Sequence, residues 1–305
     1  AARLLLAFRE GALELLRAVE ARDAQDAQVR VVDCRPWGLD RTFHIAEATS
    51  GAAECGGGAG EFGGFGHGGG PSSLVAGLQA PRCESPPFGL SIWSASFGLA
   101  RHLLENREEL ARADLGAGRA VLELGCGQPL LAMVLLEAFP RLGRVVATDG
   151  HEGVLRLARQ NLAENVPSPR PEAVLAQLRW GDAGDMARAE EINEGRKYDV
   201  ILGADVTYDH DEMGHALVQT IVGLAHRGTV VWLAHELRAD DRIGAAWATF
   251  ADELRSAFAS VEAHTRRLPG SEAPMGDRAG SPCEVEVWRC TGLLAAGAGR
   301  AAARA

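Results

Sequence analysis

The sequence predicts an α/β fold in which helices cover both faces of a doubly wound, mainly parallel sheet. Short apolar segments alternate with amphipathic segments over residues 119–290, which is the pattern of repeated β-α-β units. A glycine turn follows the first of these apolar segments, and acidic residues follow several others. Because ligands of open α/β sheets bind beyond the carboxyl ends of the strands, these turns hold the candidate functional residues.

The best-defined unit covers residues 119–149. Residues 120–124 are predicted as a buried strand, and Gly125-Cys126-Gly127 lets the backbone turn sharply and approach a ligand. A helix that is apolar on nearly all sides comes next, and residues 145–148 form the following strand. Asp149 ends this strand, about twenty residues past the turn, where an acid is placed to bind a ribose diol. The unit therefore predicts a nucleoside-cofactor site.

The unit alone leaves three alternatives for the cofactor. An NAD(P) site needs a third glycine near the pyrophosphate, and the bulky Leu130 at that position argues against it. The stretch Glu123-Leu124-Gly125-Cys126-Gly127 instead resembles the turn of class I methyltransferases that bind S-adenosylmethionine (AdoMet). Since a short glycine motif is weak evidence, an α/β domain without a nucleotide ligand stays open as the third alternative.

Composition narrows the classes of function. The chain has 305 residues, a formal net charge of −10 and a pI of about 5.4, so a nucleic-acid-binding surface is not expected. The six cysteines form no C-x-x-C pair and no histidines cluster at metal spacing, which predicts reduced thiols and no metal site. The sequence has no apolar run of membrane-spanning length and no signal-peptide pattern. We therefore expect a cytoplasmic protein without a membrane segment, with nuclear presence or an organelle presequence left open.

Four sections are predicted along the chain. Residues 1–50 form an extension with a helix over residues 3–21 and a β-hairpin within residues 30–45, which is expected to lie against the main domain. The other sections are a glycine-rich flexible linker at residues 51–87, the main domain at residues 88–290 and a disordered Ala/Gly/Arg tail at residues 291–305.

Within the main domain, two aromatic residues stand where they could border a cofactor. Trp93 begins an amphipathic helix over residues 92–105. The third strand ends at Trp180-Gly181-Asp182, where Asp182 could bind an adenine amino group and Trp180 could flank the ring. The alternative for that strand end is an edge aromatic residue with a solvated acid. The further elements predicted are helices at residues 151–164, 211–225 and 240–259, and strands at residues 174–180, 198–204, 229–234, 261–267 and 283–289.

The fourth strand leads to the candidate catalytic residues. Residues 198–204 form a short apolar run that is typical of a central parallel strand, and Asp205-Val206-Thr207-Tyr208 follows at once. Because the carboxyl ends of parallel strands share one edge of the sheet, Asp205 and Tyr208 are expected to point into the same crevice as Gly125.

Several separated motifs together resemble methyltransferase family 16, a group of protein-lysine methyltransferases that modify chaperones, ATPases and translation elongation factors. The resemblance covers residues 88–290 and includes a D/E-x-x-Y/F signature and an E-x-R stretch. Two departures from the family pattern are Gln128-Pro129, which replaces a Thr-Gly-type pair, and the glycine-rich segment before residue 71. The matching motifs are Ile92-Trp93-Ser94-Ala95, Leu122-Glu123-Leu124-Gly125-Cys126-Gly127, Thr148-Asp149, Arg179-Trp180-Gly181-Asp182, Ala204-Asp205-Val206-Thr207-Tyr208 and Glu236-Leu237-Arg238.

This resemblance implies a class I, Rossmann-like seven-stranded sheet, AdoMet as the cofactor, and a lysine side chain of a protein as the methyl acceptor. Asp205 is expected to orient the target amine, and Tyr208 to offer it a ring or hydroxyl. A protein histidine or a small molecule as acceptor, a non-catalytic AdoMet-binding scaffold and a dehydrogenase stay open, and a monomer is expected. The residues implied to surround AdoMet are Trp93, Glu123, Gly125, Cys126, Gly127, Asp149, Trp180, Asp182 and Ala204.

Overall fold

The computed structural model describes residues 26–49, 88–167, 171–207, 211–238, 241–270 and 281–295. Within these ranges the chain forms a seven-stranded sheet and a separate two-stranded hairpin, β1 (Asp26–Asp33) and β2 (Thr42–Thr49). The strands of the large sheet are β3 (Ala120–Leu124), β4 (Arg144–Asp149), β5 (Glu172–Gln177), β6 (Tyr198–Ala204), β7 (Ala225–Glu236), β8 (Phe258–Leu268) and β9 (Cys283–Leu293).

The order of the large sheet confirms the predicted doubly wound α/β fold. Its strands run in the order β5-β4-β3-β6-β7-β9-β8. The five strands from β5 to β7 pair in parallel, and β9 pairs antiparallel with both β7 and β8. The chain builds outward from β3 to β5 on one side and then resumes with β6 on the other. This reversal opens a crevice at the carboxyl ends of β3, β4 and β6.

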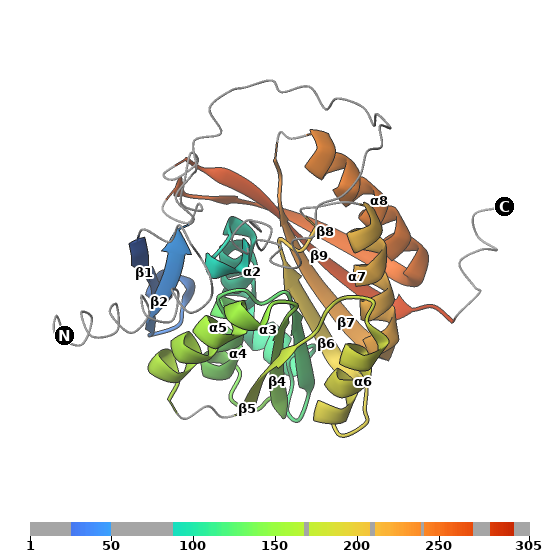
Figure 1. The fold of residues 1–305 in the computed structure, drawn as a ribbon, viewed down its shortest axis with the longest axis horizontal. Coiled ribbons are helices and arrows are strands. Elements are labelled where there is room, and N and C mark those ends of the chain that lie inside the picture. Colours follow the sequence, from blue (N-terminus) through green and yellow to red (C-terminus); the bar gives the residue numbers. More distant parts are fainter. Residues whose placement is uncertain are drawn as a thin grey trace, which may run out of the picture.

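Helices cover both faces of the sheet, as Figure 1 shows. The helices are α2 (Ser94–Glu105), α3 (Arg107–Arg112), α4 (Leu130–Ala138), α5 (Glu152–Asn165), α6 (Ala183–Ile192), α7 (Asp211–Leu224) and α8 (Asp241–Ala257), with short 3-10 turns at Arg35–Trp37 and Phe88–Leu90. The hairpin, α2 and α4 share one apolar core with the sheet, and α7 and α8 share a second core on the opposite face. The fold is therefore a three-layer arrangement with the crevice along one edge of the middle layer.

The central strand β3 is mostly apolar because both of its faces are covered. All five residues of β3 are buried, as are nearly all residues of α4, which confirms the prediction of a helix that is apolar on nearly all sides. On the other face, Tyr198 of β6 is fully buried and donates a hydrogen bond from its hydroxyl to the Ala189 carbonyl oxygen at 2.6 Å. The sequence thus places the largest apolar runs where the glycine turn and its acid are anchored.

Two asparagines of α5 attach the hairpin to the main domain. The Asn161 amide accepts a hydrogen bond from the Ala46 N–H at 2.8 Å and donates one to the Ala46 carbonyl at 2.9 Å. The Asn165 amide pairs in the same way with the N–H and carbonyl of His44, at 2.7 and 2.8 Å. These contacts join the hairpin to residues 115 and 121 positions away along the chain.

Several predicted boundaries move in the structure. Helices α3 and α6 are additional elements, β5 occupies residues 172–177 rather than 174–180, and α2 begins at Ser94 because Trp93 has an extended backbone. Strand β9 runs to Leu293, so the predicted tail from residue 291 begins inside a strand, and Leu294 N–H still donates to the Ala257 carbonyl. The antiparallel pairing with β8 continues to Leu293 and extends the strand past the apolar run.

Other predictions fall on residues outside the described ranges. They concern the helix at residues 3–21, the glycine-rich linker, the tail beyond residue 295 and Tyr208. None of the described helices is both long and apolar enough to cross a membrane. The cysteines at positions 34, 126, 283 and 290, which lie in the described part, form no disulfide.

Candidate active site

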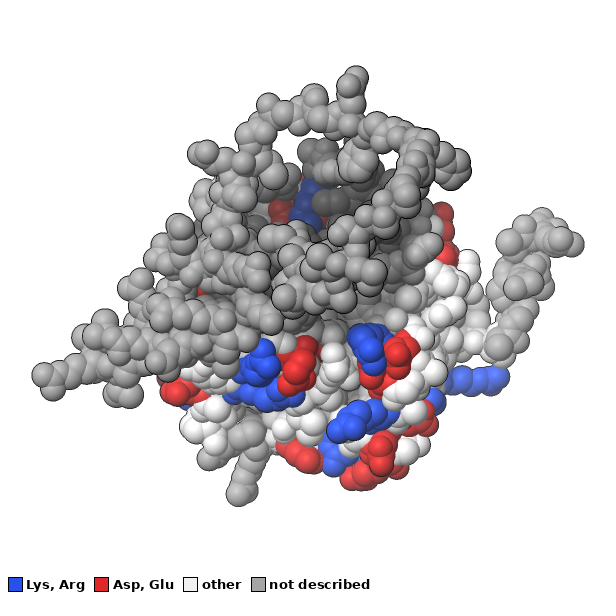
Figure 2. All heavy atoms as spheres, in the orientation of Figure 1, with Lys and Arg blue, Asp and Glu red and all other residues white. Residues whose placement is uncertain are grey.

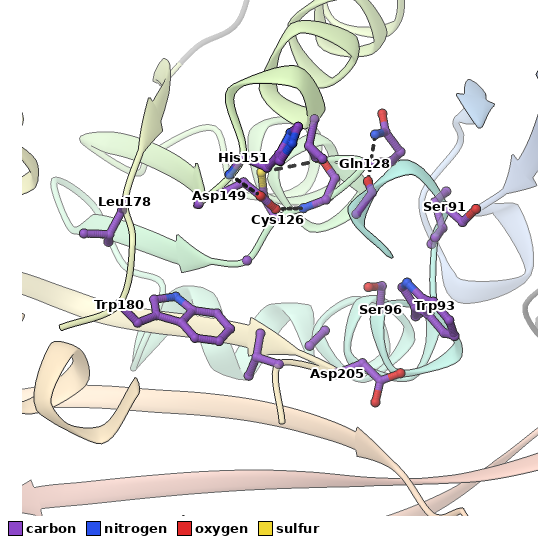
Figure 3. Close-up of a pocket in the computed structure, with 18 of the residues that line it drawn as sticks. Ser91, Trp93, Ser96, Cys126, Gln128, Asp149, His151, Leu178, Trp180 and Asp205 are labelled. Atoms are coloured by element: carbon purple, nitrogen blue, oxygen red, sulfur yellow. Dashed lines mark hydrogen bonds between the residues drawn. The ribbon is translucent and has the colours of Figure 1, made fainter. Parts of the chain in front are cut away.

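A cavity of about 760 Å³ opens at the carboxyl ends of β3, β4 and β6, in the crevice that the strand order creates. Figure 3 shows Asp149 and Cys126 on one side of it and Trp93 and Asp205 on another. Most of the site residues predicted from the sequence line this cavity, namely Trp93, Gly125, Cys126, Gly127, Asp149, Trp180, Ala204 and Asp205. The topology therefore brings together residues that lie more than a hundred positions apart in the sequence.

The glycine turn at the start of α4 leaves no room for side chains. Gly125 and Gly127 have φ angles of +62° and +49°, which side chains rarely tolerate. A Cβ on Gly125 would lie 3.0 Å from the Val206 side chain and 3.2 Å from the Trp180 ring, and a Cβ on Gly127 would lie 3.2 Å from the Gly89 carbonyl oxygen. Both glycines are needed for this close approach, so the backbone itself forms a wall of the cavity.

Asp149 lies beside this turn, held by backbone groups. One carboxylate oxygen accepts a hydrogen bond from the Gly127 N–H at 3.1 Å, and the other accepts one from the His151 N–H at 2.9 Å. Burial raises the pKa of Asp149, and the two backbone donors partly offset that rise. The carboxylate is thus fixed in direction at the edge of the cavity, as expected for an acid that receives hydroxyl groups.

Asp205 combines an unusual backbone conformation with deep burial. It follows β6 with a φ of +55°, uncommon for a residue with a side chain, and its backbone N–H donates to the Ala234 carbonyl at 2.8 Å. Its side chain is 2% exposed, and one carboxylate oxygen, Oδ1, has no hydrogen-bond donor among the described residues. Burial raises the pKa of Asp205 to about 6, and the Arg238 guanidinium acts in the opposite direction.

Arg238 assembles the acidic end of the cavity. Its guanidinium hydrogen-bonds the Asp205 carboxylate, lies 3.4 Å from a Glu236 carboxylate oxygen and stacks over the Trp93 ring with 5.2 Å between centres. His235 adds a ring nitrogen 3.7 Å from Asp205 Oδ1, and burial lowers the pKa of His235 to about 4. The end of the cavity that holds Asp205 therefore combines two acids, one permanent cation and an aromatic face.

Two residues predicted to bind the cofactor do not line this cavity. The Glu123 side chain lies under the turn, 3% exposed, and accepts a hydrogen bond from the Ala132 N–H in the first turn of α4. Burial raises its pKa to about 8. Asp182 instead caps α6, since its carboxylate accepts a hydrogen bond from the Asp185 N–H at 2.9 Å. The side chain of Glu123 faces α4, and the carboxylate of Asp182 is used to cap α6. The positions of these two residues therefore do not support the prediction that they bind the cofactor.

The sequence motifs missed several other residues of the cavity wall. Glu236 and Arg238 belong to a family-like stretch to which the sequence assigned no role in the site. Glu236 ends β7 and Arg238 lies two residues beyond it, and the carboxyl end of β7 lies beside that of β6. That neighbouring position was the available signal. The further lining residues are Gly89, Ser91, Ile92, Ser96, Gln128, Gly150, His151, Val154, Leu178, Arg179, Val206 and Met213. The described residues contain no group of three or more His, Cys, Asp or Glu that could hold a metal ion.

The sequence of this chain is similar to those of several methyltransferases. The protein-lysine N-methyltransferase EFM3 of Chaetomium thermophilum is 37% identical over 148 residues, which cover 45% of this chain and 42% of that protein. EEF1A lysine methyltransferase 3 of Xenopus tropicalis is 27% identical over 147 residues, 48% of this chain and 57% of that protein. A trans-aconitate 2-methyltransferase of Acidovorax sp. is 29% identical over 199 residues, 59% of this chain and 64% of that protein. The chain spans about half the length of the first two of these relatives.

Solved structures with a similar backbone include an O-methyltransferase from Bacillus cereus in complex with SAH. Its TM-score is 0.42 at 16% identity, covering 64% of this chain and 81% of that chain. Magnesium protoporphyrin IX methyltransferase (ChlM) from Synechocystis PCC 6803 has a TM-score of 0.43 at 17% identity, with the same coverage of 64% and 81%. The model of methyltransferase family 16, described as lysine methyltransferase, matches residues 78–247. This match covers more than half of the 305 residues of the chain, so the chain belongs to the lysine methyltransferase family.

Proposed function

We propose that this chain transfers a methyl group from AdoMet to a lysine side chain of a protein. The observation that carries the proposal is a single cavity that joins a glycine turn and its acid, Asp149, to a second buried acid, Asp205. The first pair suits a nucleoside with its ribose hydroxyls. An acid beside an aromatic ring suits an amine or a cation. Membership of the lysine methyltransferase family supports the same function.

The residues at the turn fit AdoMet in space and in hydrogen-bonding groups. A Cβ on Gly125 or Gly127 would lie too close to neighbouring atoms, so only glycine lets the backbone come this near the cavity. Asp149 would accept hydrogen bonds from the ribose hydroxyls, and Trp180 would lie along the adenine ring. A volume of about 760 Å³ lies within the range of pockets that hold ligands of this size. The proposed cofactor shell also includes Trp93, Cys126 and Ala204, which line the same cavity.

AdoMet supplies an electrophilic methyl group on a sulfonium. The task of the protein is to hold the acceptor nitrogen in line with this methyl group and to exclude water. Asp205 Oδ1 is a buried acceptor that needs a donor, and an amine N–H would provide it. Asp205 would thereby fix the direction in which the amine presents its lone pair.

Arg238 would help the acceptor lysine enter as the uncharged amine. A free lysine has a pKa of about 10.4, and its ammonium has no lone pair for methyl transfer. Burial disfavours the charged ammonium, and the Arg238 guanidinium offsets part of the attraction that Asp205 and Glu236 would exert on a second positive charge. Tyr208 lies outside the described residues, and its contribution to the amine site stays a prediction from the D/E-x-x-Y/F signature.

A protein is the proposed substrate, and a translation elongation factor is the first candidate. One relative is an EEF1A lysine methyltransferase. On the described surface in Figure 2, Lys and Arg side chains lie next to Asp and Glu side chains. Ion pairs in the described part of the chain include Arg144–Glu172 and Lys197–Glu190, with nitrogen–oxygen distances of 2.7 and 2.5 Å. Together with the acidic composition, this mixed surface favours a protein over a nucleic acid.

Two measurements test the proposal in sequence. Calorimetric titration of the purified chain should show binding of AdoMet and of S-adenosylhomocysteine, and no binding of NAD. Incubation with labelled AdoMet and a cell extract, followed by mass spectrometry, should then identify a methylated lysine in a protein. Trans-aconitate should be included as an alternative acceptor, since one relative is a trans-aconitate 2-methyltransferase. Preference for NAD, or transfer to trans-aconitate without protein methylation, would contradict the proposal.

A further inference from the structure

Buried amides connect the N-terminal hairpin to the glycine turn. Gln128, the residue after the turn, is 2% exposed. Its side-chain N–H donates to the Gly89 carbonyl at 2.9 Å, and its carbonyl accepts a hydrogen bond from the Asn161 amide at 2.6 Å. The same Asn161 side chain pairs with both backbone groups of Ala46 in β2. A continuous series of hydrogen bonds thus runs from the hairpin through Asn161 and Gln128 to Gly89.

Gly89 is the member of this series that touches the proposed cofactor residues. A Cβ on Gly127 would lie 3.2 Å from the Gly89 carbonyl oxygen, so the two backbones are already in close contact. A Cβ on Gly89 would lie 3.3 Å from an Asp149 carboxylate oxygen and 2.9 Å from the Val154 side chain. The position of Gly89 therefore determines how much space lies beside Asp149, and Gln128 holds the Gly89 carbonyl in that position.

A second contact attaches the hairpin to the next part of the same segment. Glu47 of β2 is fully buried, and one carboxylate oxygen accepts a hydrogen bond from the Ile92 N–H at 2.6 Å. Its other oxygen accepts a hydrogen bond from Arg30 of β1 at 2.7 Å. Ile92 directly precedes Trp93, and both line the cavity. The hairpin thus holds residues 89–93 at two points along one wall of the cavity.

We propose that Gln128 is a positioning residue for AdoMet, because it holds Gly89 beside Asp149. The inference rests on the proposed function. A glutamine is long enough to reach Gly89 and Asn161 at once, whereas a threonine at this position would reach neither of them in the same geometry. The contacts of Gln128 therefore account for its departure from the family pattern in this chain.

The matched comparison for this proposal is Gln128→Met against Asn165→Leu. Asn165 docks the hairpin through His44 as Asn161 does through Ala46, and its other side-chain hydrogen bond goes to the Asn161 carbonyl rather than to Gln128. Both variants replace a buried amide with an apolar side chain of similar length and so remove its hydrogen bonds. Gln128→Met should weaken binding of S-adenosylhomocysteine about tenfold, the effect of one well-placed buried hydrogen bond. Asn165→Leu should keep wild-type affinity even where its Tm falls as far or further.

Gln128→Glu adds a pH readout that a purely structural role would not show. An uncharged glutamic acid can donate to the Gly89 carbonyl and accept from Asn161, as glutamine does, whereas the carboxylate cannot donate. Burial raises the pKa of such a carboxyl, so the neutral form prevails at mildly acidic pH. Affinity relative to wild type should therefore be near normal at pH 5 and should fall toward pH 8.

Three outcomes would overturn the inference. They are wild-type affinity in Gln128→Met, equal losses of affinity in Gln128→Met and Asn165→Leu, and a Gln128→Glu variant whose relative affinity does not change with pH. If Gln128→Met does not fold, the pH series of Gln128→Glu decides alone. Absence of AdoMet binding in the wild-type chain would be a different result, because it would remove the proposed function itself.

Discussion

The two acids at the ends of the cavity are held in different ways. Asp149 receives hydrogen bonds from the backbone N–H groups of Gly127 and His151, whereas Asp205 pairs with the guanidinium of Arg238. Burial raises the pKa of both acids. Backbone donors cannot move away, so Asp149 is suited to fixed recognition of a ligand. A side-chain cation can move, so the charge at Asp205 depends on Arg238 and on whatever amine arrives.

The largest effect is expected from a substitution that disables the end of the cavity with Asp205 and leaves the end with Asp149 intact. Asp205→Asn keeps the size of the side chain and removes its charge, so transfer of labelled methyl to the protein substrate should fall roughly 10²-fold, as for a misplaced reacting group. Calorimetry should show AdoMet affinity within a few-fold of wild type. The control is Asp199→Asn at the opposite end of β6, which should transfer at the normal rate. A near-normal rate in Asp205→Asn would make this carboxylate structural.

Breaking the cofactor end should have the reverse signature. Asp149→Ala removes the proposed acceptor for two ribose hydroxyls, and AdoMet binding should weaken by about 2–3 kcal/mol, or about 30- to 150-fold in Kd. Asp182→Ala serves as the control, because Asp182 caps α6 and does not line the cavity. It should lose about 1 kcal/mol of folding stability and keep its affinity for AdoMet. Equal affinities of Asp149→Ala and wild type would contradict the proposed ribose contact.

The effect of Arg238 on the ionisation of Asp205 can be measured from how the rate of methyl transfer depends on pH. If ionised Asp205 is required, the wild-type rate should fall about tenfold per pH unit below about pH 6, the value that burial gives its pKa. Arg238→Met removes the guanidinium that lowers this pKa, so the acidic limb should move to higher pH. The comparison uses single-turnover rates from pH 5 to pH 8. Asp205→Asn should lack this limb, and an unshifted limb in Arg238→Met would show that another group titrates.

The smallest effect is expected for Glu123→Gln, whose change in Tm with pH tests whether Glu123 is buried beneath the turn. Its pKa rises from 4.5 to about 8 on folding, so the folded chain holds one more proton than the unfolded chain between these values. The stability it contributes is therefore lost as pH rises through that window. Glu123→Gln cannot ionise, so its Tm relative to wild type should increase from pH 5 to pH 8. A Tm difference that is constant with pH would show that Glu123 is already ionised at neutral pH.

The sequence was most informative where short local signals and deep burial agree. The bounds of β6 are those predicted, and the glycine turn with Asp149 lies as expected, because a central strand covered on both faces is mostly apolar and stands out in the sequence. Strand β5 lies at the edge of the sheet and is partly exposed, so its sequence pattern is weaker and its predicted bounds were displaced. Helix α6 has a single buried residue, Ala189, which explains why apolar periodicity did not reveal it.

Side-chain partners across the cavity could not be predicted in the same way. Arg238 reaches Asp205 over 33 residues and Gln128 reaches Asn161 over 33 residues, so both contacts depend on how whole elements pack. Residue type and spacing indicate that an acid ends a strand, but they do not indicate which cation lies beside it. Glu123 shows the reverse case: its place in the motif suggested a ligand, whereas the packing of β3 against α4 occupies it internally.

The two asparagines of α5 also protect the hairpin from unwanted association. A two-stranded ribbon leaves the N–H and carbonyl groups of alternate residues on its free side, where a strand of another molecule could add and start aggregation. Four helical residues rise about 6 Å, close to the roughly 6.8 Å between alternate strand residues. Asn161 and Asn165, four positions apart, therefore match Ala46 and His44 and substitute for a third strand. One face of α5 thus covers the free edge of β2. Replacing both asparagines should leave this edge open to pairing with another copy of the chain.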